Sequence, residues 1–154
     1  MSTSFQDLRR HPGHLIRRAQ QVHYWLWKAE VSPEVTSPQF ACLYALRAEN
    51  NIDQKTLGER VSLDRSTVAE VVSRLTTRGL VQRFRDPKDA RRNLLRLTAA
   101  GLRTTERLIP KAERMNRLLV SAISEPERNE LLRLLNVLVD ADEGLRRQRL
   151  AGEG

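Results

Sequence analysis

The stretch DRSTVAEVVSRLTTRGLVQRFRDPKDARRNLLRLT, residues 64–98, decides the fold. Asp64 is typical of the residue that caps a helix N-terminus, and Gly79 of the residue that ends one. Between them, four apolar residues at helical spacing form an inward stripe: Val68, Val71, Val72 and Leu75. Two β-compatible runs follow, 80–84 and 94–98, separated by an arginine-rich loop. The pattern predicts a helix followed directly by a β-hairpin.

A shorter helix is expected just before this one. Asp53 is a suitable N-cap for QKTLGERV (54–61), and the turn VSL (61–63) leads into the longer helix. Two helices joined by a three-residue turn form a helix-turn-helix, whose second helix can enter the major groove of DNA. A basic hairpin directly after a helix-turn-helix is the wing of a winged helix. This order favours DNA binding over an ordinary small α-protein.

The polar face of the second helix supplies candidate DNA contacts, because side chains near the start of such a helix reach base edges. The candidates for base contacts are Arg65, Ser66, Thr67 and Glu70. Ser62 in the turn and Arg74 further along the helix are expected to contact backbone phosphates. The alternative interpretation of this face is simple solvation.

The hairpin loop RFRDPKDARRN (83–93) holds five Arg or Lys residues and two Asp residues. A narrow minor groove has an enhanced negative potential and attracts an inserted arginine. We expect Arg91 to be that residue, with Arg92 as the alternative. Asp89 is expected to hold the guanidinium in a bidentate contact. The remaining candidate cations on this surface are Arg85 and Lys88. Ordinary solubility is the competing explanation for a charged hairpin tip.

The distribution of charge supports a dedicated surface for a polyanion. The 154-residue chain has a formal net charge of +8. Residues 54–97 contain eleven Arg or Lys and five Asp or Glu, a net charge of +6. The other 110 residues contain sixteen and fourteen, a net charge of +2. The excess positive charge therefore belongs to the helix-turn-helix and wing.

Helices flank this basic centre on both sides. Residues 12–30 carry one apolar stripe, and Ser37 before Pro38 is expected to cap a second, mostly buried helix. Thr98 is expected to cap a long helix over 99–123, and SEPE (124–127) is a capping box that opens a leucine-rich final helix. The expected order is α-α-α-α-β-β-α-α, which is a mainly α fold with a small β-hairpin.

The segment 57–101 resembles the MarR (multiple antibiotic resistance regulator) family of winged-helix transcriptional regulators. The pattern D-P-x-D-x-R ending in L-x-L-T carries the resemblance, with RLTTRGLV just before it. The resemblance extends over roughly residues 10–148. It implies a single MarR-like domain over 1–154, with a winged helix-turn-helix at 36–97. The helical dimerisation region would comprise 10–35 and 98–148, and the tail 149–154 is expected to be frayed.

The resemblance also implies a homodimer that reads a pseudo-palindromic operator in double-stranded DNA, usually as a repressor. Members of this family often release DNA when a small molecule binds. The N-terminal segment of this chain is similar to that of members that sense aromatic carboxylic acids. On that resemblance Arg17 would hold the carboxylate, with His11 and His23 as hydrogen-bonding partners. Thr36 and Ser37 are weaker candidates. Arg17 and His23 point about 120° apart on a straight helix, so a pocket shared across the dimer is expected.

Other interpretations were weighed on the same residues. His11 and His14 lack further ligands for a metal site, and no cofactor is expected. Cys42 would permit redox sensing, although its apolar surroundings favour an inert thiol. No catalytic motif indicates an enzyme. A non-specific architectural DNA-binding protein is the second alternative. With one cysteine and no signal segment or membrane-spanning run, the protein is expected to be cytoplasmic, associated with the nucleoid and without a membrane partner.

Overall fold

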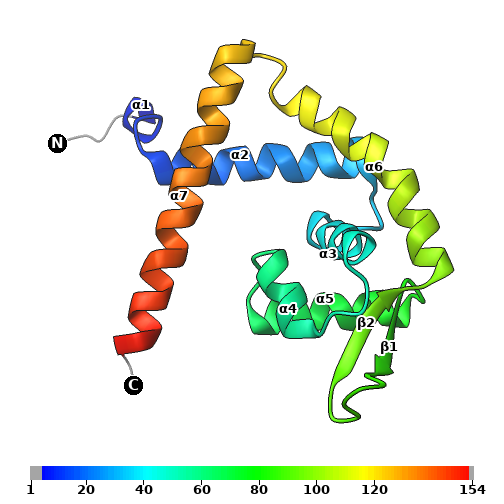
Figure 1. Ribbon diagram of the computed structural model, residues 1–154. Helices are drawn as coiled ribbons and strands as arrows, with labels where there is room; N and C mark the ends of the chain where they lie inside the picture. The colour runs from blue at the N-terminus through cyan, green and yellow to red at the C-terminus, as the bar shows by residue number, and fades with distance from the viewer. Residues whose placement is uncertain (1–4, 153–154) are drawn as a thin grey trace. The chain divides into compact units, whose positions relative to one another are not determined.

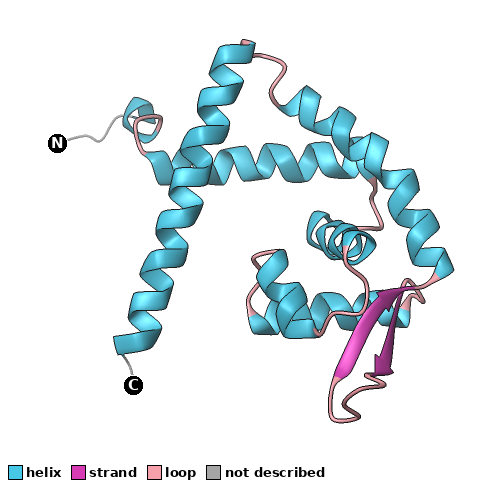
Figure 2. Ribbon diagram, viewed as in Figure 1, coloured by secondary structure: helices cyan, strands magenta, loops and turns pink. Residues whose placement is uncertain are grey.

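A computed structural model describes residues 5–152 of the chain, with side chains from 7 to 142. The fold is mainly helical with one two-stranded antiparallel sheet (Figure 1, Figure 2). The elements in chain order are α1 (Phe5–Leu8), α2 (Pro12–Leu26), a π-helical turn η1 (Trp27–Val31), α3 (Ser37–Ala48), α4 (Gln54–Arg60), α5 (Arg65–Thr77), β1 (Val81–Arg85), β2 (Asn93–Leu97), α6 (Ala99–Leu119) and α7 (Glu125–Gly152). The expected fold class is confirmed.

The chain divides into two compact units, one ending at Asn116 and the other beginning at Arg117. The core of the first unit is aliphatic and is centred on the helix-turn-helix. The inward stripe of α5 is buried throughout, as its spacing predicts. Leu43 and Leu46 of α3 and Leu57 of α4 pack in the same cluster with no exposed surface. Burial of these side chains positions α5 so that its polar face remains exposed.

The wing is held against this core by backbone hydrogen bonds. Strand β1 pairs with β2 from Val81 opposite Leu97 to Arg85 opposite Asn93. Each strand is displaced by one residue from the expected ranges 80–84 and 94–98. Ile52, between α3 and α4, forms an isolated bridge with Leu95. The wing therefore emerges directly from the side of the helix-turn-helix.

Helix capping follows the sequence signals with one correction. Asp53 and Asp64 cap α4 and α5, each accepting the backbone N–H three residues on. Gly79 ends α5 with φ at +69°, a conformation that glycine adopts without strain. Ser37, however, does not cap α3. Thr36 is the N-cap, because its hydroxyl and the Gln39 side chain form a reciprocal capping box.

The flanking helices differ from expectation at their ends. The helix expected over 99–123 ends at Leu119, and a turn then leads to the capping box of Ser124 and Glu127. Helix α7 continues four residues into the tail that was expected to be frayed, while 153–154 lie outside the described residues. None of the helices in the described part of the chain is long and apolar enough to span a membrane.

Candidate DNA-binding surface and effector site

The start of α5 is organised around the carboxylate of Asp64. Its oxygens accept hydrogen bonds from the Thr67 backbone N–H at 2.9 Å, the Thr67 hydroxyl at 2.6 Å and the Ser66 hydroxyl at 2.7 Å. The bonds from Thr67, followed by that from Ser66, hold the pKa of Asp64 well below its usual range. Because both hydroxyl hydrogens are donated to Asp64, the hydroxyl oxygens of Ser66 and Thr67 can only accept a hydrogen bond from a further partner.

The rest of the exposed face carries the other predicted helix contacts. Arg65 is exposed at the first turn of α5, and Glu70 accepts a hydrogen bond from Arg74 Nη2 at 2.7 Å one turn apart. Ser62 lies in the turn between α4 and α5 with φ at +54°, and its side chain is exposed. Of the six predicted residues of the helix-turn-helix, five are exposed and Thr67 is half-buried.

The wing loop presents Arg91 as a strongly exposed cation. Its side chain is 92% exposed. A single oxygen of Asp89 accepts hydrogen bonds from the Arg91 backbone N–H at 3.0 Å and from Nε at 3.2 Å. The predicted bidentate contact is therefore wrong, because this oxygen also closes the local turn. The two nitrogens at the end of the guanidinium face solvent.

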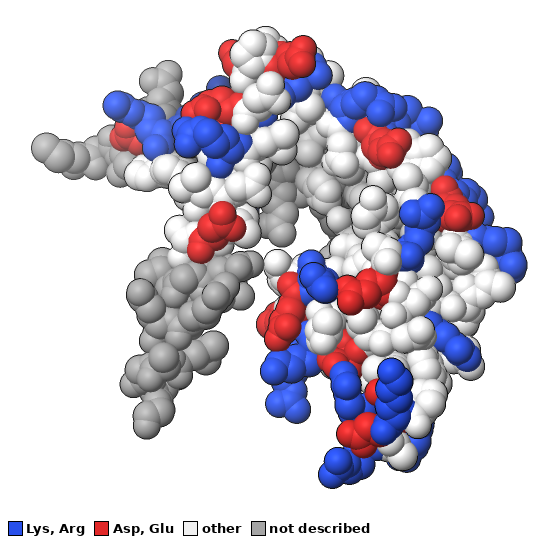
Figure 3. Space-filling view, in the orientation of Figure 1, with Lys and Arg blue, Asp and Glu red and all other residues white. Residues whose placement is uncertain are grey.

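The other cations of the wing differ in the hydrogen bonds that their side chains make. Arg85 donates from Nη1 to the Ala90 carbonyl at 2.7 Å and so spans the loop. Arg92 donates from Nη2 to Asp53 Oδ2 at 2.9 Å, across to the helix-turn-helix. The Lys88 side chain is exposed, while its backbone N–H donates to Asp86 Oδ1 at 2.9 Å. Lys and Arg side chains lie over the wing at the lower end of the space-filling view (Figure 3).

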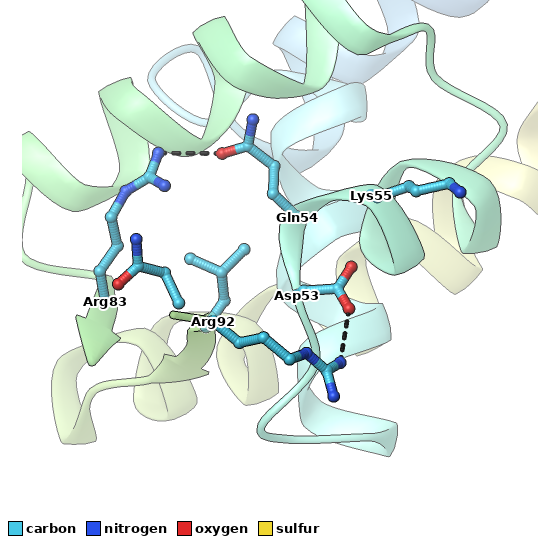
Figure 4. A pocket seen from close by; sticks show the side chains of 7 residues that line it. Asp53, Gln54, Lys55, Arg83 and Arg92 are labelled. Atoms are coloured by element: carbon cyan, nitrogen blue, oxygen red, sulfur yellow. Dashed lines mark hydrogen bonds and ion pairs between the residues drawn. The ribbon is translucent and has the colours of Figure 1, made fainter. Parts of the chain in front are cut away.

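An open cavity of about 440 Å³ lies between the wing and the start of α4 (Figure 4). Three residues that the sequence did not single out as contacts line it: Gln54, Lys55 and Arg83. Arg83 Nη2 donates to Gln54 Oε1 at 3.0 Å, and Arg92 pairs with Asp53 on the other side. The Thr56 backbone N–H, and then the Arg92 guanidinium, lower the pKa of Asp53.

The predicted effector residues on α2 are divided into separate groups. Arg17 is exposed, and its Nη2 lies 3.3 Å from Nδ1 of His14, a residue that was not assigned to the effector site. His23 is half-buried, with its ring centroid 6.0 Å from that of Trp27. His11 is the exposed N-cap of α2, and its side chain makes no capping bond. No described contact joins Arg17 to His23, as their angular separation predicts.

The sequence analysis did not predict the aromatic cluster that connects the end of α2 with α3. Trp27 donates from Nε1 to the Val35 carbonyl at 2.7 Å, and its ring packs on Phe40, which in turn packs on Tyr44. Thr36 lies beside this cluster with its hydroxyl engaged in the capping box, while Ser37 is half-buried. The cluster could have been predicted from the spacing of four residues between His23 and Trp27 and between Phe40 and Tyr44, because residues four apart are neighbours on a helix.

The redox interpretation of Cys42 loses support from the geometry. Cys42 is fully buried, and burial raises the pKa of its thiol to about 11, so the reactive thiolate is disfavoured. Within the described residues, no three side chains of His, Cys, Asp or Glu are grouped as metal ligands.

Comparison with known proteins gives the family. Residues 35–92 match the MarR family model. The transcriptional repressor NicR of Pseudomonas putida is 34% identical over 138 residues, which are 89% of this chain and 87% of NicR. The chain belongs to the MarR family. Its members are transcriptional regulators, which confirms the expectation that this protein is a DNA-binding repressor and not an enzyme.

Solved structures of MarR-family regulators agree with this assignment. The PcaV regulator of Streptomyces coelicolor, in complex with its natural ligand, is 52% identical with a TM-score of 0.86, over 92% of this chain and 99% of PcaV. BpsR of Bordetella bronchiseptica, whose DNA binding is regulated by 6-hydroxynicotinic acid, is 30% identical with a TM-score of 0.75, over 82% of this chain and 97% of BpsR. The predicted resemblance to members that sense aromatic carboxylic acids is thereby confirmed.

Proposed function

We propose that this MarR-family repressor acts as a homodimer that leaves a pseudo-palindromic operator when it binds a small aromatic carboxylate such as a hydroxybenzoate. The observation that carries the proposal is the exposed guanidinium of Arg17 beside His14, on a helix that has no buried side chain. A guanidinium with a neighbouring imidazole is a suitable recognition group for a carboxylate. The similarity to BpsR, which responds to an aromatic acid, supports the ligand class.

The DNA side of the proposal is supported by two exposed features of the first unit. The acceptor oxygens of Ser66 and Thr67, together with Arg65 and Glu70, are suited to base edges in the major groove. Ser62 and Arg74 are the proposed phosphate contacts. On the wing, the exposed Arg91 is the proposed minor-groove residue, and Lys88 extends the positive surface towards the backbone.

The homodimer is supported by apolar surface that one chain leaves exposed. In α2, five large apolar or aromatic side chains are at least 45% exposed: Leu15, Ile16, Val22, Tyr24 and Trp25. In α7, seven such residues are exposed: Leu131, Leu132, Leu134, Leu135, Val137, Leu138 and Val139. Continuous exposed apolar faces of this kind mark interaction surfaces. A second copy of the chain would cover them and would bring a second α2 close enough to complete a shared effector pocket.

A thermal-shift experiment tests the ligand class. We expect 4-hydroxybenzoate to raise the melting temperature of the wild-type protein, because a ligand that binds only the folded state stabilises it. The neutral analogue 4-hydroxybenzamide should have little effect, since it lacks the carboxylate. Arg17→Ala should abolish the shift, whereas Arg18→Ala, the loss of an equal charge next to it, should retain it.

Two outcomes would contradict the effector assignment. One is an undiminished shift in Arg17→Ala that remains folded by circular dichroism. The other is the absence of any shift across benzoates, hydroxybenzoates and hydroxycinnamates, which would exclude the ligand class itself. The same variants should keep operator binding in the absence of ligand, because Arg17 lies on α2, outside the helix-turn-helix and wing.

A further inference from the structure

We infer that Arg92 is a positioning residue, whose ion pair with Asp53 fixes the wing on α4 so that Arg91 is presented to DNA. This inference rests on the proposed function of Arg91 in the minor groove. The sequence suggested Arg92 as an alternative to Arg91 for insertion into the minor groove, and the inference gives it a positioning role instead. Asp53 would then have two roles, because it also caps α4.

The two oxygens of Asp53 have separate partners, of which Figure 4 shows Arg92. Oδ1 accepts the Thr56 backbone N–H at 2.8 Å and caps α4, while Oδ2 accepts Arg92 Nη2 at 2.9 Å. The hydrogen bond that caps α4 orients the Asp53 carboxylate independently of the wing. The acceptor for Arg92 is therefore positioned by the helix-turn-helix itself.

The ion pair is the outermost of several ties between the wing and the helix-turn-helix. Closer to the core, the Leu95 N–H donates to the Ile52 carbonyl at 2.8 Å and the Asn51 N–H to the Leu95 carbonyl at 2.9 Å. These bonds hold the middle of β2. Arg92 lies three residues further towards the tip, and its own carbonyl accepts the Asp86 N–H at 2.9 Å, which closes the loop.

Arg92 could position the wing or contact DNA directly, and the two roles predict opposite effects on DNA binding when the charge of Asp53 is removed. A guanidinium paired with Asp53 is already neutralised, so it has little part in displacing counterions from DNA phosphates. If Arg92 instead contacted DNA directly, Asp53 would compete with the phosphates for it. Removing the charge of Asp53 would then strengthen DNA binding. If Arg92 positions the wing, the same change weakens DNA binding, because Arg91 is no longer held in one orientation.

The test uses Asp53→Asn and Arg92→Gln in the full-length protein, with operator affinity measured across a salt series. Asparagine is a good N-cap, so Asp53→Asn retains the cap of α4 while it removes the charge. We expect each variant to weaken operator binding several-fold. The double variant should be no weaker than Arg92→Gln alone, because Arg92→Gln already removes the contact with Asp53 together with the longer ion pair from Nη1 to Asp86 Oδ2 at 3.9 Å. The dependence of log K on log salt should keep the wild-type slope, and Arg92→Lys should recover part of the affinity.

Three results would overturn the inference. The first is tighter operator binding by Asp53→Asn, and the second is wild-type affinity in both variants. The third is a salt slope that falls by about one in Arg92→Gln, which is the change expected for a lost phosphate contact. Arg91→Ala in the same assay separates the inference from the proposed function. If Arg91→Ala binds normally, the wing assignment itself fails. If Arg91→Ala is impaired while Asp53→Asn is not, only the role of the ion pair fails.

Discussion

Residues of the basic centre divide according to what their charged groups contact. Arg83, Arg85 and Arg92 donate to acceptors within the chain, so their geometry is set by the fold. Arg65 and Lys88 are exposed and make no described side-chain contact, and Arg91 is held by the neighbouring Asp89 alone. Charge alone therefore overstates how many cations are available for DNA.

Arg91→Ala is expected to weaken operator binding by about 2 kcal/mol, roughly thirty-fold, while the protein stays folded. The reason is the loss of the one wing guanidinium whose terminal nitrogens face solvent at the tip. Arg91→Lys keeps the charge but not the planar donor set, and should recover part of the loss. Gel-shift titrations with circular dichroism of each variant give the measurement. Unchanged affinity in a folded Arg91→Ala protein would refute the minor-groove role.

Single-residue predictions from sequence succeeded where the signal was local. Asp53, Asp64 and Gly79 were assigned correctly, because capping and helix termination depend on a few neighbouring residues. The cap of α3 was misplaced by one residue, since Pro38 permits either Thr36 or Ser37 as the N-cap. The contact of Asp53 with Arg92 spans 39 positions, and no periodicity relates the two residues.

Elements of the winged region follow from periodicity because one face of each is buried. The inward face of α5 and the two strands of the wing were predictable for this reason. The π-helical turn at Trp27–Val31 was not, because its residues have the same apolar spacing as an α-helix. The end of α6 at Leu119 was also missed, since the apolar residues beyond it continue the helical pattern.

The junction between the wing and α6 depends on a glycine. A methyl group at Gly101 would overlap the Leu80 carbonyl, which is also the acceptor for the Thr98 backbone N–H. We expect Gly101→Ala to lower the free energy of unfolding by at least about 2 kcal/mol, although alanine favours a helix by about 1 kcal/mol. Denaturant unfolding gives the measurement.

Gly13→Ala is the matched control for this prediction. It lies in the first turn of α2, and an added methyl group there has no atom within 4 Å. This variant should be neutral or slightly stabilising. Equal stability of the Gly101→Ala protein and the wild type would show that the close approach to Leu80 does not constrain the junction.

At the scale of the whole molecule, α2 and α7 each carry several large apolar side chains that are exposed. The excess of leucine in the last helix was visible in the sequence, but a single chain does not specify which faces pair. We propose the same origin for the division of the predicted effector residues along α2, with Arg17 of one protomer and His23 of the other meeting around one ligand. Dimerisation and ligand response are therefore proposed as linked properties.

Release from the operator is the most direct test of the proposed function. An operator duplex is first selected from random sequences, and its affinity for the wild-type dimer is then measured by fluorescence anisotropy at fixed salt, with and without 4-hydroxybenzoate. We predict a preference of about a thousand-fold or more over random DNA, and loss of that preference when the acid is added. Equal affinity for random and selected duplexes, or operator binding that no aromatic acid weakens, would contradict the proposal.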